Sequence, residues 1–426
     1  MLWLGFLLLA FVLTRLYHLG LMPPFLDELI YVRWLSEIRL NGDWLIPLKE
    51  FGWEPLGIWS AALLNRFISD PVLSLRLNSV LISSFALALI YKLAGRAAAL
   101  IYILSPLILL HDRLGLRGDN LVVLASLMVY YGLRQRAAIW WGLGIAVGLL
   151  SKTTAAALPI VVIISYLWLR PKLKRSDFAA GALAVLPLVF YYFSGTLGAV
   201  VGKQSTFVGE ALVRNNLLQI GPWLYQYLTW PVGLLIVVGL AAAIKNRLLL
   251  INCLVPLILL AVSAKILFPR YLLPIVPFLL IYAASGFNWL KQKLPRILKP
   301  LLIVFLLAPA WFSWQILKDI TAAPLPEIDK WQYVTGWPSG YGVKDLVDYL
   351  RFNPAGLLIV EDNDLIRIGI NYYWPEHSFA VTQTATSGAE LVTNISDQLP
   401  EGFTGELIKE FPRPGNKSSI KLYELD

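Results

Sequence analysis

Two apolar runs divided by a single lysine decide the fold of this chain: AAIWWGLGIAVGLLS at 137–151 and TTAAALPIVVIISYLWL at 153–169, with Lys152 between them. A membrane-crossing helix needs about 20 mostly apolar residues, so each run is long enough once its flanks are included. Nine similar runs lie at 1–14, 77–91, 97–110, 119–133, 177–194, 223–244, 248–264, 271–290 and 300–316. We therefore predict an all-α polytopic membrane bundle of about eleven transmembrane helices.

The composition agrees with a membrane bundle. Of 426 residues, 58% are hydrophobic and 15% are charged, whereas soluble domains average about 45–50% and about 25%. This balance excludes an ordinary soluble enzyme, and it also excludes a disordered chain, which needs the opposite composition. The single cysteine, Cys253, excludes a disulfide framework and a cysteine-based metal cluster.

The basic residues predict the topology. Segment 55–69 (PLGIWSAALLNRFIS) is short and carries Asn65 and Arg66, which favours a helix lying in the membrane interface. If this helix does not cross, fourteen Lys and Arg fall in loops on one side and seven in the short loops on the other. Positive charge marks the cytoplasmic side, and a topology signal of this kind gives no reason to expect a nucleic-acid partner. The fourteen lie at 92–96, 134–136, 170–175, 245–247 and 291–299.

In this topology the N-terminus lies inside and the long loops 15–76 and 195–222 lie outside. Residues 1–14 have no basic region before them and no cleavage site after them, so they are expected to be a retained first span. From residue 318 the chain is rich in Asp, Glu, Gly, Pro and Asn, and no further span follows. We predict a transmembrane module at 1–317 and a small α/β extracytoplasmic domain at 318–426. In that domain we expect strands at 356–362 and 419–425 and a helix at 343–352.

The first outer loop carries two adjacent carboxylates, Asp27 and Glu28, just after Pro23-Pro24. On a helix the two side chains project about 100° apart, so one carboxylate can face a cavity while the other holds the first in position. A carboxylate partly removed from water can act as a general base. The alternative is that the pair caps a helix or solvates the loop.

A second charged cluster, HDRLGLRGDN at 111–120, brings Asp112, Arg113, Arg117 and Asp119 to the same outer side. Ionisable groups at membrane depth are costly and often functional. The alternatives are an interfacial salt-bridge network and, for Asp119, helix N-capping.

Three further features are expected on the outer side: Lys152, Arg270-Tyr271 and Trp53-Glu54-Pro55. Lys and Arg at this depth can hold a lipid phosphate, although each alone can simply extend to the headgroups. The three histidines show no metal-ligand spacing, and Gly142, Gly144 and Gly148 suit close helix packing.

These pieces together resemble the GT-C superfamily of polyprenyl-phosphate-sugar glycosyltransferases, above all its protein O-mannosyltransferase and aminoarabinose transferase branch. Two departures leave the acceptor open: WEPL stands at 53–56 in place of a Lys-Pro-Pro-Leu-like run, and the second outer loop lacks a long inserted domain. The matching pieces, in the family's order, are Asp27-Glu28, WEPLGIW (53–59), RLGLRGD (113–119), LLSKT (149–153), FPRYLLP (268–274) and GWPSGYG (336–342).

The resemblance implies a GT-C fold and a donor sugar carried on a polyprenyl phosphate. It implies Asp27 as the base that takes a proton from an acceptor hydroxyl, with Glu28 orienting the acceptor or Asp27. The acceptor is a protein, a lipid or a glycan. No nucleotide is needed, and a divalent cation is the one cofactor left open. The resemblance also implies that Asp119, Glu54 and Asp112 bind the sugar or the acceptor. The residues that it implies for binding the lipid phosphate are Arg270, Tyr271, Lys152, Arg117 and Arg113.

Other functions remain open. A multi-span transporter or lipid flippase has as many spans, but it places its ionisable residues near mid-membrane. Here the charges gather at the outer rim. A glycan polymerase or ligase that uses a lipid diphosphate donor and a structural subunit without catalysis are the remaining alternatives. We expect the protein in the cell membrane, with its site and C-terminal domain outside.

Overall fold

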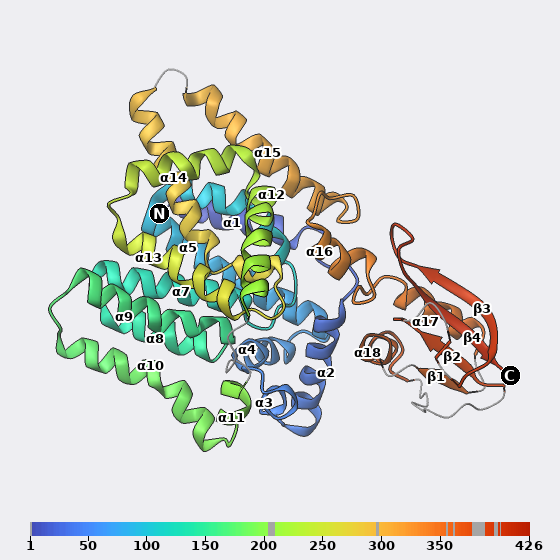
Figure 1. Cartoon of the computed structure of the whole chain (residues 1–426). Coiled ribbons are helices and arrows are strands. Elements are labelled where there is room, and N and C mark those ends of the chain that lie inside the picture. Colours follow the sequence, from blue (N-terminus) through green and yellow to red (C-terminus); the bar gives the residue numbers. More distant parts are fainter. Residues whose placement is uncertain are drawn as a thin grey trace. The chain divides into compact units, whose positions relative to one another are not determined.

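The computed structural model describes residues 2–202, 209–294, 298–354, 357–360, 363–376, 388–395, 399–400 and 402–426. The chain forms two compact units (Figure 1). Unit 1 comprises Met1–Leu19 and Glu37–Asp319, and unit 2 comprises Gly20–Ser36 and Ile320–Asp426. The sequence did not predict that residues 20–36 belong with the C-terminal residues.

Unit 1 is helical. Helix α2 (Leu26–Asn41) begins in unit 2 and ends in unit 1. The other elements of unit 1 are α1 (Leu2–Leu16), α3 (Ile46–Phe51), α4 (Leu56–Asn65), α5 (Pro71–Leu104), α6 (Pro106–Asp112), α7 (Asp119–Gln135), α8 (Ala138–Leu149), η1 (Thr153–Ala156), α9 (Ala157–Leu169), α10 (Arg175–Phe193), α11 (Leu197–Gly202), α12 (Glu210–Ala243), α13 (Arg247–Ser263), η2 (Pro269–Leu272), α14 (Val276–Lys293) and α15 (Leu298–Lys318).

Helix α5 consists of two segments that run in opposite directions. Gly95 between them has a positive φ of 79°, which glycine adopts without strain. Arg76, near the start of the first segment, donates to the carbonyl oxygen of Leu19 beyond the end of α1, and Arg96, just after Gly95, lies over the ring of Trp3 at the start of α1. Ile103, near the end of the second segment, accepts from Arg15 at the end of α1 at 2.8 Å, so this segment runs back. The two successive helices predicted at 77–91 and 97–110 are therefore present, although Ser105-Pro106 divides the second. Pro106 lacks an N–H, and Ser105 before it is extended.

The start predicted for the helix at 223–244 is wrong, because α12 begins at Glu210. Its first turns carry Arg214 and Asn216, which lower the local hydropathy without preventing a helix. Asn216 is buried and its amide donates to the carbonyl oxygens of Ala261 and Ala264, both at 2.9 Å. The helix changes direction at Thr229, where φ is 62°.

Three of the described helices are both long and apolar enough to cross a membrane: α5, α10 and α12. Shorter apolar segments include α1, α4, α8, α13 and η1 with α9. Together they make the chain an integral membrane protein, while the number of eleven spans stays a prediction. Helix α4 has ten residues, about 15 Å at 1.5 Å per residue. That is half of a hydrocarbon core of about 30 Å, so its length agrees with an interfacial helix.

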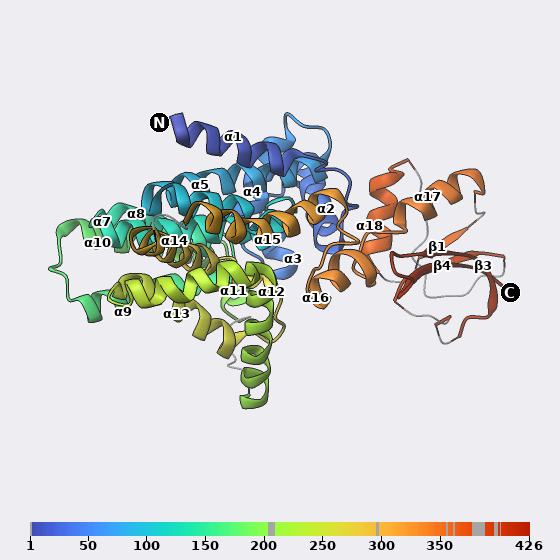
Figure 2. The same cartoon turned by 90° about the horizontal axis from the view of Figure 1, so that it is seen from above.

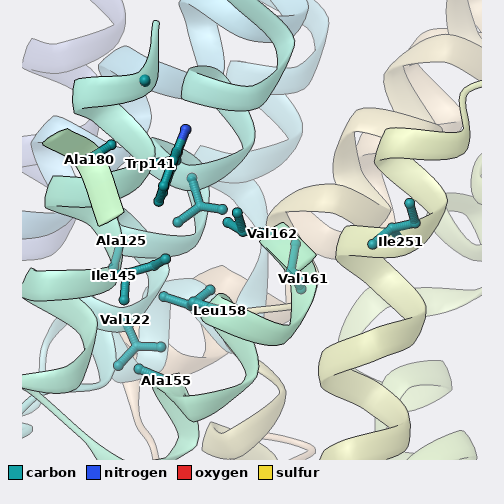
Figure 3. Packing of buried hydrophobic residues seen from close by; sticks show 12 residues of the cluster. Val122, Ala125, Trp141, Ile145, Ala155, Leu158, Val161, Val162, Ala180 and Ile251 are labelled. Atoms are coloured by element: carbon teal, nitrogen blue, oxygen red, sulfur yellow. The ribbon is translucent and has the colours of Figure 1, made fainter. Parts of the chain in front are cut away.

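Helices α7, α8, α9, α10 and α13 share a close-packed core (Figure 3), in which Trp141, Val162 and Ile251 are buried. The glycines of α8 permit this packing. A Cβ on Gly142 would lie 2.5 Å from the carbonyl oxygen of Ala180, and one on Gly148 would lie 2.8 Å from Leu158 Cδ1. Their predicted packing role is confirmed.

Unit 2 is a small α/β structure. Its four-stranded sheet has the order β1-β2-β4-β3, with β1 parallel to β2 and the other pairs antiparallel. Figure 2 shows α17 over one face of this sheet. The predicted helix and the strand 419–425 are confirmed at their exact bounds. Within the strand predicted at 356–362, Leu358–Val360 form a strand. Residues 356, 361 and 362 of that prediction lie outside the described residues. The elements are α16 (Glu327–Lys330), η3 (Trp331–Thr335), α17 (Val343–Phe352), β1 (Leu358–Val360), α18 (Asp364–Tyr373), β2 (Glu390–Thr393), β3 (Gly405–Pro412) and β4 (Ser419–Leu425).

Candidate active site

Three of the sequence motifs meet in unit 1 with their backbones in contact: WEPLGIW (53–59), RLGLRGD (113–119) and LLSKT (149–153). A Cβ on Gly57 would lie 1.2 Å from the carbonyl oxygen of Arg117, and one on Gly118 would lie 2.2 Å from that of Ser151. The amide of Leu56 donates to the carbonyl oxygen of Leu150 at 2.9 Å. Because both glycines lack a Cβ, the segments around 54, 117 and 152 can approach this closely.

Arg117 and Glu54 form a buried ion pair at this junction. The Nη1 atom of Arg117 lies 3.0 Å from Glu54 Oε2, and its guanidinium lies 4.7 Å from the centre of the Trp53 ring. Both side chains are almost fully buried. The second carboxylate oxygen, Oε1, has no hydrogen-bond partner among the described residues. An acceptor oxygen of this carboxylate therefore remains available for a ligand hydroxyl.

Lys152 and Asp119 form the second buried ion pair. Asp119 is the first residue of α7, and Lys152 directly precedes η1, so both are fixed at helix ends. The Lys152 ammonium also lies 4.4 Å from the centre of the Tyr271 ring. The guanidinium carbon of Arg270 lies 5.8 Å from the centre of the same Tyr271 ring and 5.1 Å from the centre of the Phe268 ring. Two cations thus lie near the Tyr271 ring, whose π face attracts positive charge.

Three buried cations, Arg117, Lys152 and Arg270, gather at this site. Arg117 and Lys152 are paired with the carboxylates of Glu54 and Asp119. Arg and Lys donors of this kind suit a phosphate.

Two buried residues near the site were not predicted from the sequence. His111, on α6, interacts electrostatically with Asp119, Arg270 and Lys152. Tyr191, on α10, donates from its hydroxyl to the carbonyl oxygen of Leu149 at 2.8 Å and interacts with Glu54 and Arg117. His111 opens the HDRLGLRGDN motif, but its ring gives no metal-ligand spacing that would have singled it out. Tyr191 stands within an apolar run that shows no pattern of polar residues.

The structure separates Asp112 and Arg113 from these pairs. Asp112 accepts from Arg15 at 3.2 Å and from Ser83 at 2.6 Å, and the first pair is fully buried. Arg113 donates to the carbonyl oxygens of Tyr17 and His18 at 2.7 and 3.0 Å. Burial, with the nearby guanidinium groups of Arg76 and Arg15, lowers the pKa of Arg113 to about 10. These contacts fasten the end of α1.

Asp27 and Glu28 lie in the first turn of α2, in unit 2, with Glu28 buried and Asp27 partly buried. The GWPSGYG segment (336–342) holds the backbone just before them. The amide of Leu26 donates to the carbonyl oxygen of Pro338 at 2.9 Å, and a Cβ on Gly340 would lie 2.0 Å from that of Pro24. Two motifs far apart in sequence therefore form one local structure.

Arg413 supports the GWPSGYG segment from behind. Its Nε donates to the carbonyl oxygen of Ser339 at 3.3 Å, and an Nη atom donates to the side-chain oxygen of Asn394. The Asn394 amide in turn donates to the carbonyl oxygen of Trp337 at 3.2 Å. Burial lowers the pKa of Arg413 to about 10. Arg413 is a positioning residue that sequence reasoning missed.

Among the described residues, no group of three or more His, Cys, Asp or Glu is arranged to hold a metal ion. Arg117 and Lys152 are paired with the carboxylates of Glu54 and Asp119. Buried cationic donors of this kind can bind an anion, with carboxylate oxygens beside them.

Comparisons with known proteins agree with this architecture. No model of a protein family matches the chain, and no curated protein sequence matches it. It is similar in structure to ArnT from Cupriavidus metallidurans in the apo state, with a TM-score of 0.66 and 13% sequence identity over 99% of this chain and 97% of that chain. For ArnT bound to undecaprenyl phosphate the TM-score is 0.63 and the identity 14%, with the same coverage. The chain therefore has the GT-C fold of this aminoarabinose transferase, as the sequence resemblance predicts.

Proposed function

We propose that the chain is a membrane glycosyltransferase that moves a sugar from a polyprenyl-phosphate donor to a hydroxyl acceptor. The observation that carries this proposal is the gathering of three buried cations, Arg117, Lys152 and Arg270, beside the carboxylates of Glu54 and Asp119. A lipid-linked phosphate supplies the anion that such a site favours. The shared fold with a transferase that binds undecaprenyl phosphate supports this class of donor.

In the proposed reaction the acceptor oxygen attacks the anomeric carbon of the donor sugar. The bond between that carbon and the phosphate oxygen breaks, and the phosphate leaves with the electron pair. Negative charge grows on the leaving phosphate, and Arg270, Lys152 and Arg117 stabilise it from fixed positions. Because these donors are already placed by ion pairs and aromatic rings, they need little reorganisation during the reaction.

The acceptor hydroxyl loses its proton to Asp27 in this proposal, and Glu28 orients the acceptor or Asp27 itself. Both roles rest on the sequence resemblance. Asp119 and Glu54 bind sugar hydroxyls through carboxylate oxygens beside the cations. Asp112 and Arg113 have no part in the proposed site, since they fasten the end of α1. The acceptor is a protein, a lipid or a glycan.

We place this reaction on the extracytoplasmic side of the cell membrane. The supporting observation is the distribution of Lys and Arg among the short loops, fourteen against seven. A cysteine introduced in the loop 171–174 should be labelled by a membrane-impermeant reagent only after the cells are opened. Labelling of that loop in intact cells would reverse the orientation.

The test uses the full-length protein in membranes supplied with labelled undecaprenyl-phosphate sugars (a hexose, a pentose and an aminopentose). We expect Asp27→Asn to lower transfer by at least about 10²-fold, because it removes a general base, while undecaprenyl phosphate still binds. Asp348→Asn, at an exposed carboxylate on α17, is the matched control and should transfer normally. Wild-type transfer by Asp27→Asn would contradict the proposal.

A multi-span transporter or lipid flippase is the second candidate. It would place its ionisable residues near mid-membrane, whereas Asp119, Lys152 and Arg270 lie at helix ends. Movement of the intact lipid-linked sugar across liposomes, without cleavage of the sugar–phosphate bond, would favour this candidate over a transferase.

A further inference from the structure

A charged pocket opens in unit 1 where α7 ends and α10 begins. It has a volume of about 350 Å³. Arg134 and Arg136 reach it from the end of α7, and Lys172 and Lys174 from the connection before α10. Asp177 is the one carboxylate of this lining, so the pocket carries an excess of three positive charges. An anion is the ligand that this charge favours.

The carboxylate of Asp177 does not neutralise the four cations through side-chain ion pairs. One of its oxygens accepts from the hydroxyl of Tyr166 at 2.8 Å, and the other accepts from the backbone amide of Lys174 at 2.8 Å. Ser165, also part of the lining, is buried, and its hydroxyl has no hydrogen-bond partner among the described residues. The pocket therefore offers a buried hydroxyl donor in addition to its cations.

An apolar groove of about 310 Å³ adjoins this pocket and shares Trp141, Tyr166 and Asp177 with it. The rest of its lining is apolar, and Ile163, Leu167 and Phe178 are exposed along it. Two residues that line the groove, Trp141 and Val162, are held in place because they belong to the packed core of Figure 3. Exposed apolar side chains on membrane helices face lipid chains.

This pocket is separate from the candidate active site. Asp119 is the first residue of α7, and Arg134 lies fifteen residues later on the same helix. At 1.5 Å per residue the two are about 22 Å apart. The four cations belong to the loops that the charge distribution assigns to the cytoplasmic side.

We propose that this pocket and groove together bind one anionic phospholipid. The phosphate head group lies among Arg134, Arg136, Lys172 and Lys174, with Ser165 as an additional donor. One acyl chain lies in the apolar groove along Ile163 and Leu167. A soluble anion would use the pocket without the groove, and a zwitterionic lipid would use the groove without the excess charge. An anionic phospholipid is complementary to both.

The experiment uses the full-length protein in mild detergent, incubated with phosphatidylglycerol, and native mass spectrometry to count the lipid retained. Lys172→Gln/Lys174→Gln removes two charges from the pocket. The matched control, Lys291→Gln/Lys293→Gln, removes two exposed charges at the end of α14, on the same predicted side. We expect about tenfold weaker retention in the first variant, since each basic residue contributes to anionic lipid binding, and wild-type retention in the control.

A second variant, Ile163→Trp, fills the groove and keeps every charge. It should also weaken retention of phosphatidylglycerol, while an equal concentration of inorganic phosphate should not displace the lipid from the wild type. Equal retention by the two lysine double variants would overturn the proposal, and so would unchanged retention by Ile163→Trp. Displacement by inorganic phosphate would assign the pocket to a soluble anion instead.

Discussion

The guanidinium of Arg117 lies 3.0 Å from a carboxylate oxygen of Glu54, and both side chains are buried. This pair joins the WEPLG segment to the RGD segment at the candidate active site. Removing one partner leaves a buried charge without compensation, which costs about 3–5 kcal/mol. Removing both partners in favour of apolar side chains avoids that cost.

We therefore expect Glu54→Leu and Arg117→Met each to lower the unfolding temperature of the solubilised protein, and the double variant to recover most of the loss. Thermal unfolding of all four proteins forms the cycle that isolates the pair. The exposed pair of Lys344 and Asp348 is the comparison, because surface pairs contribute about 0–1 kcal/mol. If the double variant loses as much as the two single variants combined, the pair has no such coupling.

Gly57→Ala tests the close approach of α4 to the loop at Arg117. The added Cβ would lie 1.2 Å from the backbone carbonyl oxygen of Arg117, so one of the two segments has to move. We expect a loss of about 1–3 kcal/mol together with lower donor affinity, measured by thermal unfolding and by binding of undecaprenyl phosphate. Gly181→Ala on α10, where nothing lies within 4 Å of the added Cβ, should leave both unchanged. Equal behaviour of the two variants would show that the approach imposes no constraint.

Arg413→Gln should loosen the segment that carries Asp27 without touching it. The side chain donates to Ser339, and residues 336–342 in turn hold the backbone of Pro24 and Leu26. We expect faster amide hydrogen exchange at Leu26 and the first turn of α2 in the full-length protein. Exposed Arg351 is the control position, where Arg351→Gln should leave that exchange at the wild-type rate. Unchanged exchange at Leu26 in Arg413→Gln would remove Arg413 from this positioning role.

A pH dependence is expected at the sheet of unit 2. Burial and then the charge of Glu424, its partner on β4, raise the pKa of Glu390 above its usual 4.5. A carboxyl with a raised folded-state pKa destabilises the fold when ionised, so stability falls as the pH rises from about 4.5 through the folded-state pKa. Amide exchange in β2 should therefore be slower near pH 4.5 than near pH 7, after correction for intrinsic rates.

Glu390→Gln should remove this pH dependence and protect β2 at neutral pH. Glu406→Gln is the control, since Glu406 lies on β3 at the other side of Glu424. Persistence of the dependence in Glu390→Gln would mean that another group causes it.

Much of the architecture followed from local patterns. Helix α17 matches its predicted bounds because Val343, Leu346, Val347 and Leu350 follow the helical period and are all buried. Strands β2 and β3 were missed for physical reasons. The first has only four residues, and the second is exposed along most of its length, so neither produces a strong apolar alternation.

The candidate site was predictable only in part. The motifs of Glu54, Arg117 and Lys152 do converge, and glycines at 57 and 118 permit it. Within HDRLGLRGDN, however, spacing alone could not tell that Asp112 and Arg113 contact α1 and its following residues while Arg117 and Asp119 pair with Glu54 and Lys152. That division depends on where α6 ends and α7 begins. The partners of residues 20–36, more than 300 positions later, leave no trace in local periodicity.

The hydrogen bond between Leu26 and Pro338 also sets an order of events during synthesis. The two residues are 312 positions apart. At about 5–20 residues per second, the ribosome adds Pro338 about 15–60 s after Leu26. Through that interval the start of α2 lacks its partner segment, so the carboxylates of Asp27 and Glu28 reach their final environment only near the end of translation. A nascent chain truncated before residue 338 should therefore contain every buried cation of unit 1. In that chain the first turn of α2, with Asp27 and Glu28, should still lack its contact with Pro338.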